Sequence, residues 1–381
     1  MKYLYPILFA LLLTACTKSK YTDITGTVKG FTSGTVIIKD AAGAAKFNIS
    51  IEGGKFHFRQ IIDTAGYYTM RIMEDSFIGH RRNGYDVYLE PGTYTITAMP
   101  ETAHQYPAIT SSSPMQNELS AYYSIANQKT GASSKLLEKY TDTLNGKISR
   151  DELISASVSL NDALKSRDSA MATALQVYVS KYPQSHVAAH IMYQLNYASN
   201  PAVYYPIYQK FTDEQKKSIE GADEGDRLSS LMKLMPGAVA PQLVGKTLDG
   251  KAFDYKALNK KIILVEFWRA DDEVSRANHK NLIKGYRSPI KNKDMAMVSV
   301  SLDIEHGVWA NAVSDDKITW TQVCDLKGQD SPNVNNWQIS KIPTYYLLDG
   351  TNWKIIKGNM LLGDVPDVME KYLKSKPASN N

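Results

Sequence analysis

The sequence predicts a multidomain protein of mixed α+β and α/β class. A small antiparallel β sandwich or barrel comes first, a helical middle region follows, and an α/β domain ends the chain. Three changes of pattern predict this order. Short alternating runs of apolar and polar residues fill the first part, apolar residues at helical spacing fill the middle, and strongly apolar runs separated by charged stretches fill the last part. A length of 381 residues is enough for two or three domains.

The composition is that of an ordinary globular protein. Apolar residues make up 43% of the chain and charged residues 22%, which excludes the disordered and low-complexity classes. The formal net charge is only +5, and no block of five or more like charges occurs in the sequence. Because no basic stripe with interleaved aromatic residues is present either, we expect no nucleic-acid partner.

The N-terminus carries an export signal. A positively charged start is followed by an apolar run from Leu4 to Leu13, which is too short to span a hydrocarbon core about 30 Å thick. The run leads into Leu13-Thr14-Ala15-Cys16, which resembles the lipobox of bacterial lipoproteins. The resemblance implies a signal peptide over 1–15, lipidation of Cys16 and a polar tether over 16–20. The alternative is an ordinary secretory signal with a chance cysteine.

A lipidated Cys16 implies that the membrane is a partner of the mature protein. Each buried methylene contributes about 0.8 kcal/mol, so several acyl chains hold the protein stably. Thr17-Lys18 provides no acidic cue for surface export. We therefore expect a lipid-anchored protein of the cell envelope, in the outer membrane and facing the periplasm.

Residues 21–100 are expected to form the β domain. Period-two alternation and β-branched runs predict strands, at Thr35–Ile38, Lys55–Arg59, Tyr85–Leu89 and Thr93–Thr97. Gly53-Gly54 marks a turn, and Pro91-Gly92 marks a hairpin or another tight turn. The Gly-Lys-Phe-x-Phe and Leu-Glu-Pro-Gly-x-Tyr stretches resemble a small β domain of unknown function found in Bacteroidetes lipoproteins.

A linker rich in Ser, Thr and Pro is expected over 101–114, and a helical region over 115–235. Two sets of residues at helical spacing predict one apolar face, namely Leu136, Leu137 and Tyr140, and Leu153, Leu160 and Leu164. Three prolines predict that the region is divided into short helices, at Pro183, Pro201 and Pro206. The function of the helical region stays open.

Residues 236–376 are expected to form the α/β domain, with a flexible tail over 377–381. Apolar runs predict strands, several of them buried on both faces, at Ile262–Trp268, Met295–Ser301, Thr344–Gly350 and Trp353–Ile356. A charged, helical stretch separates the first two strands, and an amphipathic helix over Val365–Leu373 closes the domain.

This domain resembles the membrane-associated thioredoxin-like reductases of the TlpA and ResA type over 237–375. The match is carried, in order, by Ala240-Pro241, Leu248-Asp249-Gly250-Lys251, Val265-Glu266-Phe267-Trp268, Ile342-Pro343-Thr344 and Leu348-Asp349-Gly350. The resemblance implies a thioredoxin-like fold and a cis-proline at Pro343. It also implies thiol–disulfide oxidoreductase chemistry, provided that the reactive cysteines are present.

Those cysteines are absent. The family motif Phe-Trp-Ala-x-Trp-Cys-x-x-Cys-Arg aligns without a gap on the ten residues from Phe267 to Arg276. The alignment puts Asp271 in place of the second aromatic residue, and Asp272-Glu273-Val274-Ser275 in place of the Cys-x-x-Cys segment. Disulfide exchange requires an attacking thiolate and a resolving thiol. We therefore expect no two-cysteine exchange and no cofactor.

Asp272 has two interpretations. The simpler one is an N-cap of the helix that follows, because Asp is a favoured cap and its charge suits the positive helix end. The alternative is a carboxylate that serves a cation or acts as an acid or base in a cleft beside Pro343.

Cys324 is the only other cysteine, so an intramolecular disulfide is excluded if Cys16 is lipidated. A buried, inert thiol is the simpler interpretation, and a relocated redox nucleophile is the alternative. His186 and His190 are four residues apart on an expected helix. They lack a third ligand, so we expect no metal site.

Ile342-Pro343 is the best-preserved part of the family's site. The resemblance implies that the backbone before Pro343 accepts an extended peptide by hydrogen bonds, and the alternative is that the cis bond serves only the fold. The sequence thus predicts an envelope-anchored TlpA-type lipoprotein that binds a peptide or protein client. Its degenerate redox site is formed by Trp268, Asp271, Asp272, Ser275, Ile342 and Pro343. Two other functions remain open, a thiol oxidoreductase that uses Cys324 and glycan or envelope-component binding by the β domain.

Overall fold

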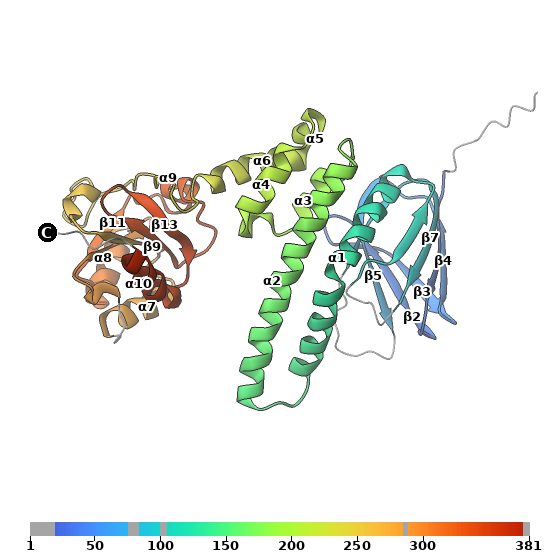
Figure 1. Cartoon of the computed structure of the whole chain (residues 1–381), viewed down its shortest axis with the longest axis horizontal. Coiled ribbons are helices and arrows are strands. Elements are labelled where there is room, and N and C mark those ends of the chain that lie inside the picture. Colours follow the sequence, from blue (N-terminus) through green and yellow to red (C-terminus); the bar gives the residue numbers. More distant parts are fainter. Residues whose placement is uncertain (1–19, 75–83, 100–104, 285–288, 376–381) are drawn as a thin grey trace, which may run out of the picture. The chain divides into compact units, whose positions relative to one another are not determined.

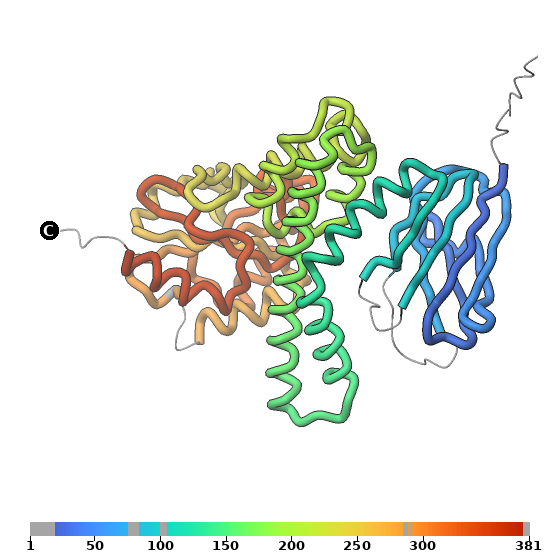
Figure 2. Tube along the Cα trace, turned by 45° about the vertical axis from the view of Figure 1, so that its right-hand side comes forward, coloured from blue at the N-terminus to red at the C-terminus, as the bar shows by residue number. Residues whose placement is uncertain are grey.

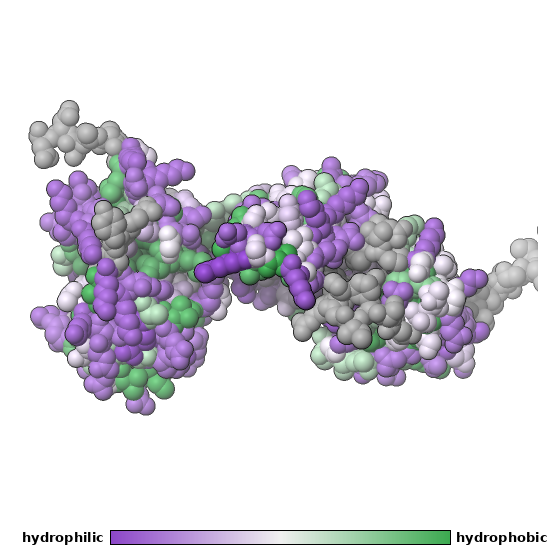
Figure 3. Space-filling model, turned by 90° about the horizontal axis from the view of Figure 1, so that it is seen from below, coloured by the Kyte–Doolittle hydropathy of each residue, from purple (hydrophilic) through white to green (hydrophobic). Residues whose placement is uncertain are grey.

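The computed structural model describes residues 20–74, 84–99, 105–284 and 289–375 (Figures 1 and 2). The chain divides into two compact units. Unit 1 holds the residues up to Asn196 together with Ile207–Ala222, and unit 2 holds Tyr197–Pro206 together with the residues from Asp223 onward. On the face seen in Figure 3, hydrophilic side chains cover most of the described surface.

Some of the expectations for the two ends of the chain fall outside the described residues. These are the signal peptide over 1–15, the lipidation of Cys16 with most of the tether, and the tail over 377–381. Within the described ranges, the structure contains no helix with both the length and the apolar character needed to span a membrane.

Unit 1 begins with an eight-stranded curled sheet in the order β6-β5-β2-β3-β4-β1-β7-β8. Its strands are β1 (Thr22–Val28), β2 (Ser33–Lys39), β3 (Ala45–Glu52), β4 (Lys55–Gln60), β5 (Gly66–Glu74), β6 (Tyr85–Leu89), β7 (Gly92–Ala98) and β8 (Ala108–Ser111). Neighbouring strands are antiparallel except β1 and β7, which pair in parallel. The all-antiparallel sheet expected from the sequence is therefore wrong at this pair. Gly53 and Gly54 make the tight β3–β4 turn with φ of 56° and 74°, a backbone conformation that favours glycine.

Two connections differ from the sequence expectation. Pro91-Gly92 forms a tight turn but not a hairpin, because β6 pairs with β5 while β7 pairs with β1 and β8. The segment 101–114, expected to be a linker, contains β8, which pairs with β7 along its whole length. The Ser/Thr-rich composition that indicated a linker is equally compatible with a short edge strand.

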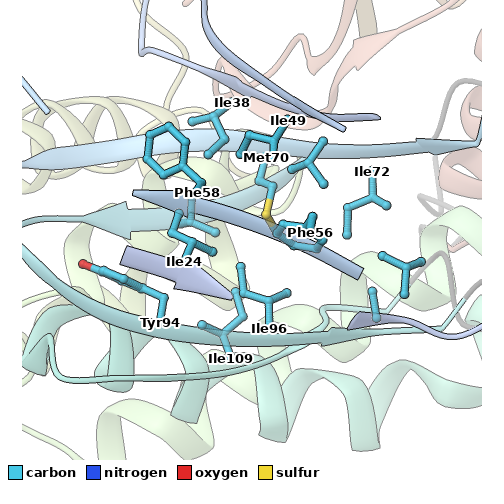
Figure 4. Close-up of a cluster of buried hydrophobic side chains, with 14 of the residues drawn as sticks. Ile24, Ile38, Ile49, Phe56, Phe58, Met70, Ile72, Tyr94, Ile96 and Ile109 are labelled. Carbon is cyan, nitrogen blue, oxygen red and sulfur yellow. The ribbon is translucent and has the colours of Figure 1, made fainter. Parts of the chain in front are cut away.

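The core of this sheet is built from alternate strand residues. Ile24, Ile38, Met70 and Ile96 come from four different strands and meet in one buried cluster (Figure 4). The period of two in the sequence puts every second side chain on the same face of a strand, which is why the expected strands and this cluster agree.

Two helices of 32 residues each follow, α1 (Pro114–Asn145) and α2 (Arg150–Lys181), and they lie side by side in both ribbon views. Ser113 caps α1 by accepting a hydrogen bond from the backbone N–H of Gln116. Ser149 and Glu152 form a capping box at the start of α2.

The apolar face predicted for these helices is wrong in part. Leu137 is buried, but Leu136, Leu153 and Leu164 are exposed. The buried positions of α2 include the alanines 156, 163, 172 and 174 instead. Small side chains let two helices approach closely, so alanines fill much of the packed face, together with larger residues such as Leu119 and Leu175.

Shorter helices complete the middle of the chain, α3 (Ala188–Gln194), α4 (Pro201–Gln209), α5 (Asp213–Lys217) and α6 (Ile219–Met232). The three prolines that were expected to divide the helical region therefore divide only its part after α2 into short helices. Pro201 begins α4, which fits the first turn of a helix, but Pro206 lies inside α4. The boundary between the two units falls within α4 and again within α6.

Unit 2 contains a five-stranded sheet in the order β11-β10-β9-β12-β13. Its strands are β9 (Ile262–Trp268), β10 (Met295–Ser301), β11 (Thr321–Cys324), β12 (Thr344–Asp349) and β13 (Lys354–Met360), and its helices are α7 (Glu273–Lys284), α8 (His306–Asp315), α9 (Pro332–Asn336) and α10 (Val365–Ser375). The first three strands are parallel, and β12 is antiparallel to both β9 and β13. This order and these directions are those of a thioredoxin-like fold, as the resemblance implies.

The central strand β9 fixes the candidate site. All seven of its residues are buried, and its alternate side chains enter separate clusters on the two faces of the sheet. Because the strand is anchored on both faces, the loop that follows Trp268 and the helix that begins at Glu273 start from a rigid point.

Candidate functional site at the end of strand β9

The degenerate motif lies where the fold places a redox site, between the end of β9 and the start of α7. Phe267 is opposite Thr344 in the β9–β12 ladder, so the end of β9 lies beside the Ile342–Pro343 segment that precedes β12. The Ile342–Pro343 peptide bond is cis. The structure thus brings the replaced motif and Pro343 together at one end of the sheet.

Asp272 caps helix α7. Its Oδ1 accepts hydrogen bonds from the backbone N–H of Ser275 at 2.7 Å and from the Ser275 hydroxyl at 2.6 Å. Its backbone carbonyl accepts from the N–H of Arg276 at 3.1 Å, the first hydrogen bond of the helix. A carboxylate at a helix N-terminus is stabilised by the helix dipole and by these donors. The side chain is therefore held in the N-cap role, and the buried Ser275 is bound to it.

The other residues of the motif have separate positions. Asp271 is exposed over 63% of its side chain and forms an ion pair with Arg269 two residues before it. Trp268 is fully buried and packs with Trp309 and Cys324. Trp268 therefore supports the site from beneath and does not line its surface, which differs from its inclusion among the expected site residues.

A buried polar network lies beneath the cap. Glu266 is fully buried in β9 and accepts hydrogen bonds from the hydroxyls of Ser299 at 2.5 Å and Tyr345 at 2.6 Å. Nε2 of His279 on α7 lies 3.1 Å from the same carboxylate. A buried carboxylate is tolerable only when its oxygens are hydrogen-bonded, and three partners from three elements achieve that here.

The network continues from His279 to the far side of α7. Nδ1 of His279 lies 2.9 Å from Asp316, which also accepts from Nε of Arg276 at 2.5 Å. Burial lowers the pKa of His279, but the carboxylates of Glu266 and Asp316 outweigh it and the pKa is raised overall. Burial opposes ionisation of Asp316, yet Arg276 and His279 hold its pKa below the ordinary value. His279, placed between two carboxylates, thus joins α7 to the sheet.

Sequence reasoning did not identify this network. One signal was available, since Glu266 is a charged residue in an otherwise apolar run, Ile262–Trp268. A lone carboxylate in a strand buried on both faces requires partners. The identity of those partners depends on residues 13 to 79 positions away, which no local pattern reveals.

Cys324 is buried at the end of β11. Its thiol donates to the carbonyl of Asp303 at 3.5 Å and accepts from the N–H of Leu326 at 3.3 Å. Burial raises the pKa of the Cys324 thiol above its ordinary value. A nucleophilic cysteine needs an accessible, electropositive setting that lowers its pKa, and this thiol has the opposite environment.

Ile342 presents unpaired backbone at the site. Its side chain is half-buried, and within the described ranges neither its N–H nor its carbonyl has a hydrogen-bond partner. On the other side of β9, an apolar hollow of about 320 Å³ is lined by Leu302, Ile304 and Val308, next to Asp271. Open backbone on one side and an apolar hollow on the other are the features of a surface that accepts an extended chain.

The two histidines of the helical region do not share a ligand. His186 is exposed, with Nδ1 3.0 Å from Glu118. His190 is buried, with Nε2 2.5 Å from Asp86 and Nδ1 2.7 Å from Glu220. Across the part of the chain that the structure describes, no group of three or more His, Cys, Asp or Glu side chains is arranged to hold a metal ion.

Comparisons with known proteins match the two parts of the chain separately. A family model described as a domain of unknown function (DUF4369) matches residues 22–119. No curated protein sequence matches the chain.

Three solved structures are among those similar to this chain. The thioredoxin domain of a thiol-disulfide oxidoreductase from Bacteroides vulgatus is 29% identical over 36% of this chain and 98% of that domain, with a TM-score of 0.33. A thiol-disulfide oxidoreductase from Bacteroides fragilis is 29% identical over 36% of this chain and 97% of its own, with a TM-score of 0.30. A thioredoxin-like protein from Bacteroides caccae is 18% identical over 61% of this chain and 87% of its own, with a TM-score of 0.44. The strand order of unit 2, β11-β10-β9-β12-β13, is itself that of a thioredoxin-like fold.

Proposed function

We propose that this protein is a thioredoxin-like lipoprotein of the cell envelope that binds an extended peptide or protein client without exchanging disulfides. The observation that carries the proposal is the hydrogen-bonded pair of Asp272 and Ser275 at the start of α7. These two oxygen-bearing side chains stand where the fold's reaction needs two thiols, and neither can form or resolve a mixed disulfide.

The surroundings of the pair support a binding role. The proton of the Ser275 hydroxyl is committed to Asp272, and Glu266 beneath them is engaged by Ser299, Tyr345 and His279. A redox site needs a group that can give or take a proton as thiols react, whereas both oxygens of Glu266 and Oδ1 of Asp272 already accept structural hydrogen bonds. The site is therefore a rigid platform.

The client would lie along the end of β9. The unpaired N–H and carbonyl of Ile342 offer one rung of backbone hydrogen bonds to an extended chain. Ile304, exposed over 69% of its surface, and Val308 offer a seat for an apolar client side chain. Lipidation of Cys16 would keep this surface at the membrane.

The experiment is a binding titration with a peptide that has no thiol. S-carboxymethylated insulin B chain, labelled with a fluorophore, is titrated with the full chain and followed by anisotropy. Ile342→Pro removes the backbone N–H, and Ile342→Val is its matched control because it keeps the backbone donor. Ile304→Ser removes the apolar seat at an exposed position where folding is unaffected.

We expect saturable binding by the wild type and by Ile342→Val. Binding should weaken about tenfold in Ile342→Pro, since one backbone hydrogen bond is lost, and severalfold in Ile304→Ser. The proposal fails if the wild type does not bind the peptide, or if all three variants bind it like the wild type.

A further inference from the structure

A cavity of about 350 Å³ lies within unit 1, where the β-sheet meets the helices. Five separate elements contribute to it, including β5 through Thr69. Tyr85 and Asp86 come from β6, Tyr123 from α1, Arg167 and Asp168 from α2, and Gln194 from the end of α3. We call it the tyrosine pocket. Its volume falls in the range of small-molecule sites.

The walls of the tyrosine pocket are held in place by contacts with one another and with the residues behind them. The ring of Tyr123 stacks on Tyr106 with 3.9 Å between centroids. The Tyr106 hydroxyl donates to the carbonyl of Asp86 at 2.7 Å and accepts from Gln116 at 3.0 Å. The carboxylate of Asp86 lies 2.5 Å from Nε2 of the buried His190. A pocket whose walls are fixed in this way is pre-formed for a ligand.

Arg167 provides a donor that no described residue accepts. Its Nε atom is buried and has no hydrogen-bond partner in the described part of the chain. Leaving a charged donor without an acceptor is costly, so a buried unsatisfied group of this kind indicates a missing partner. An oxygen atom of a ligand in the tyrosine pocket would supply that acceptor.

The charges around the pocket indicate a ligand without net charge. One cationic side chain, Arg167, and one further carboxylate, Asp168, both line the pocket, and the carboxylate of Asp86 is paired with the imidazole of His190. The lining thus offers donors and acceptors in balance, together with aromatic surface from Tyr85 and Tyr123. Sugars present hydroxyls that both donate and accept, and their C–H faces pack on aromatic rings.

We propose that the tyrosine pocket binds a neutral saccharide, with the Arg167 guanidinium donating to a sugar oxygen and Asp168 accepting from a sugar hydroxyl. The tyrosine rings contact the apolar face of the sugar. This site is separate from the end of β9 and does not depend on the function proposed for it. Both the β-sheet and the α1–α2 pair would contribute residues to the binding site, since both line the pocket.

The test is isothermal titration of the full chain with maltose, lactose, N-acetylglucosamine and the dipeptide alanyl-phenylalanine. Arg167→Gln replaces the guanidinium with a shorter neutral amide, and Asp168→Asn removes the charge while keeping side-chain size. Asp162→Asn, at an exposed position on the same helix outside the pocket lining, is the matched control. Thermal unfolding of each variant establishes that unit 1 is folded.

We expect saturable binding of at least one of the three sugars, weakened about tenfold or more in both pocket variants and unchanged in Asp162→Asn. Absence of binding by all three sugars up to about 10 mM would overturn the proposal. Binding of the dipeptide alone would do the same, and so would sugar binding that both pocket variants retain.

Discussion

At the residue scale, the contrast between Asp272 and Cys324 explains how this chain uses the fold. Asp272 stands where an attacking thiol is expected, and its carboxylate is bound by the backbone and hydroxyl of Ser275. The free thiol in the described part of the chain, that of Cys324, is buried at the end of β11. The half-buried motif position thus carries a carboxylate in place of a thiol, and the Cys324 thiol is shielded from solvent.

Removal of the Asp272 cap should destabilise unit 2. Asp272→Ala leaves the N–H of Ser275 without its acceptor, and loss of such a cap costs about 1 kcal/mol of unfolding free energy. Asp271→Ala is the control, because its exposed ion pair with Arg269 contributes little. Urea unfolding of the two variants and the wild type measures the difference. Equal stability of the two variants would contradict the cap role of Asp272.

The Cys324 thiol should be unreactive in the native protein. Burial raises its pKa, so little thiolate forms at neutral pH and reagents cannot reach the sulfur. We expect Ellman's reagent at pH 8 to modify Cys324 only after guanidinium is added, with Cys324→Ser giving the background from Cys16. Rapid modification of Cys324 without denaturant would show instead that the thiol is available for chemistry.

At the element scale, His190 connects three pieces of unit 1. Its imidazole lies between Asp86 of β6 and Glu220 of α6, and its ring stacks on Tyr67 of β5 with 3.3 Å between centroids. Burial lowers the pKa of His190, but the two carboxylates raise it to about 9. The protonated ring on α3 is therefore held to two sheet strands and to α6.

Substitution of His190 should be far more damaging than substitution of its neighbour. His190→Gln leaves two partly buried carboxylates without their buried cation. Breaking a fully buried pair costs roughly 3–5 kcal/mol, so we expect a loss of about 2 kcal/mol or more here. His186→Gln is the matched control on the same segment, since the exposed pair of His186 with Glu118 contributes about 0–1 kcal/mol. Chemical unfolding followed by circular dichroism compares the two. Similar losses of unfolding free energy in both variants would contradict the stabilising role of His190.

The contribution of His190 should also depend on pH. Because its pKa is raised on folding from 6.5 to about 9, folding favours the protonated form. The stabilisation is therefore fully present below about pH 6.5 and is lost as the pH rises through about 9. We expect the stability difference between the wild type and His190→Gln to shrink over that interval. A difference that stays constant between pH 6 and 10 would be inconsistent with a charged His190.

At the scale of the whole molecule, local sequence patterns predicted the strands in which the arrangement of apolar residues is most regular. Period-two alternation located β4 and β7, and unbroken apolar runs located β9 and β10. The order of short motifs around Pro343 predicted the thioredoxin-like arrangement of unit 2. These features depend on neighbours within a few residues or on a motif of fixed spacing, so the sequence displays them directly.

Features that depend on distant pairing were not predictable in the same way. The parallel β1–β7 pair, the alanine-lined contact of α1 with α2, the Glu266–His279 network and the tyrosine pocket all join segments that are far apart in sequence. Only packing decides which residues meet, and a leucine pattern that is correct for an isolated helix can face solvent. At the candidate site, the positions of Asp272 and Ser275 were therefore predictable, whereas the support beneath them was not.

The central claim is that unit 2 retains the thioredoxin-like scaffold without its electron exchange. Dithiothreitol-coupled reduction of insulin by the full chain tests it most directly, with Cys324→Ser as the control. The Asp272→Cys/Ser275→Cys double variant is the positive reference, since it restores two thiols at a helix N-terminus. We predict that the wild type and Cys324→Ser both match the rate without protein while the double variant accelerates reduction. Turnover by the wild type above that of Cys324→Ser would contradict the claim.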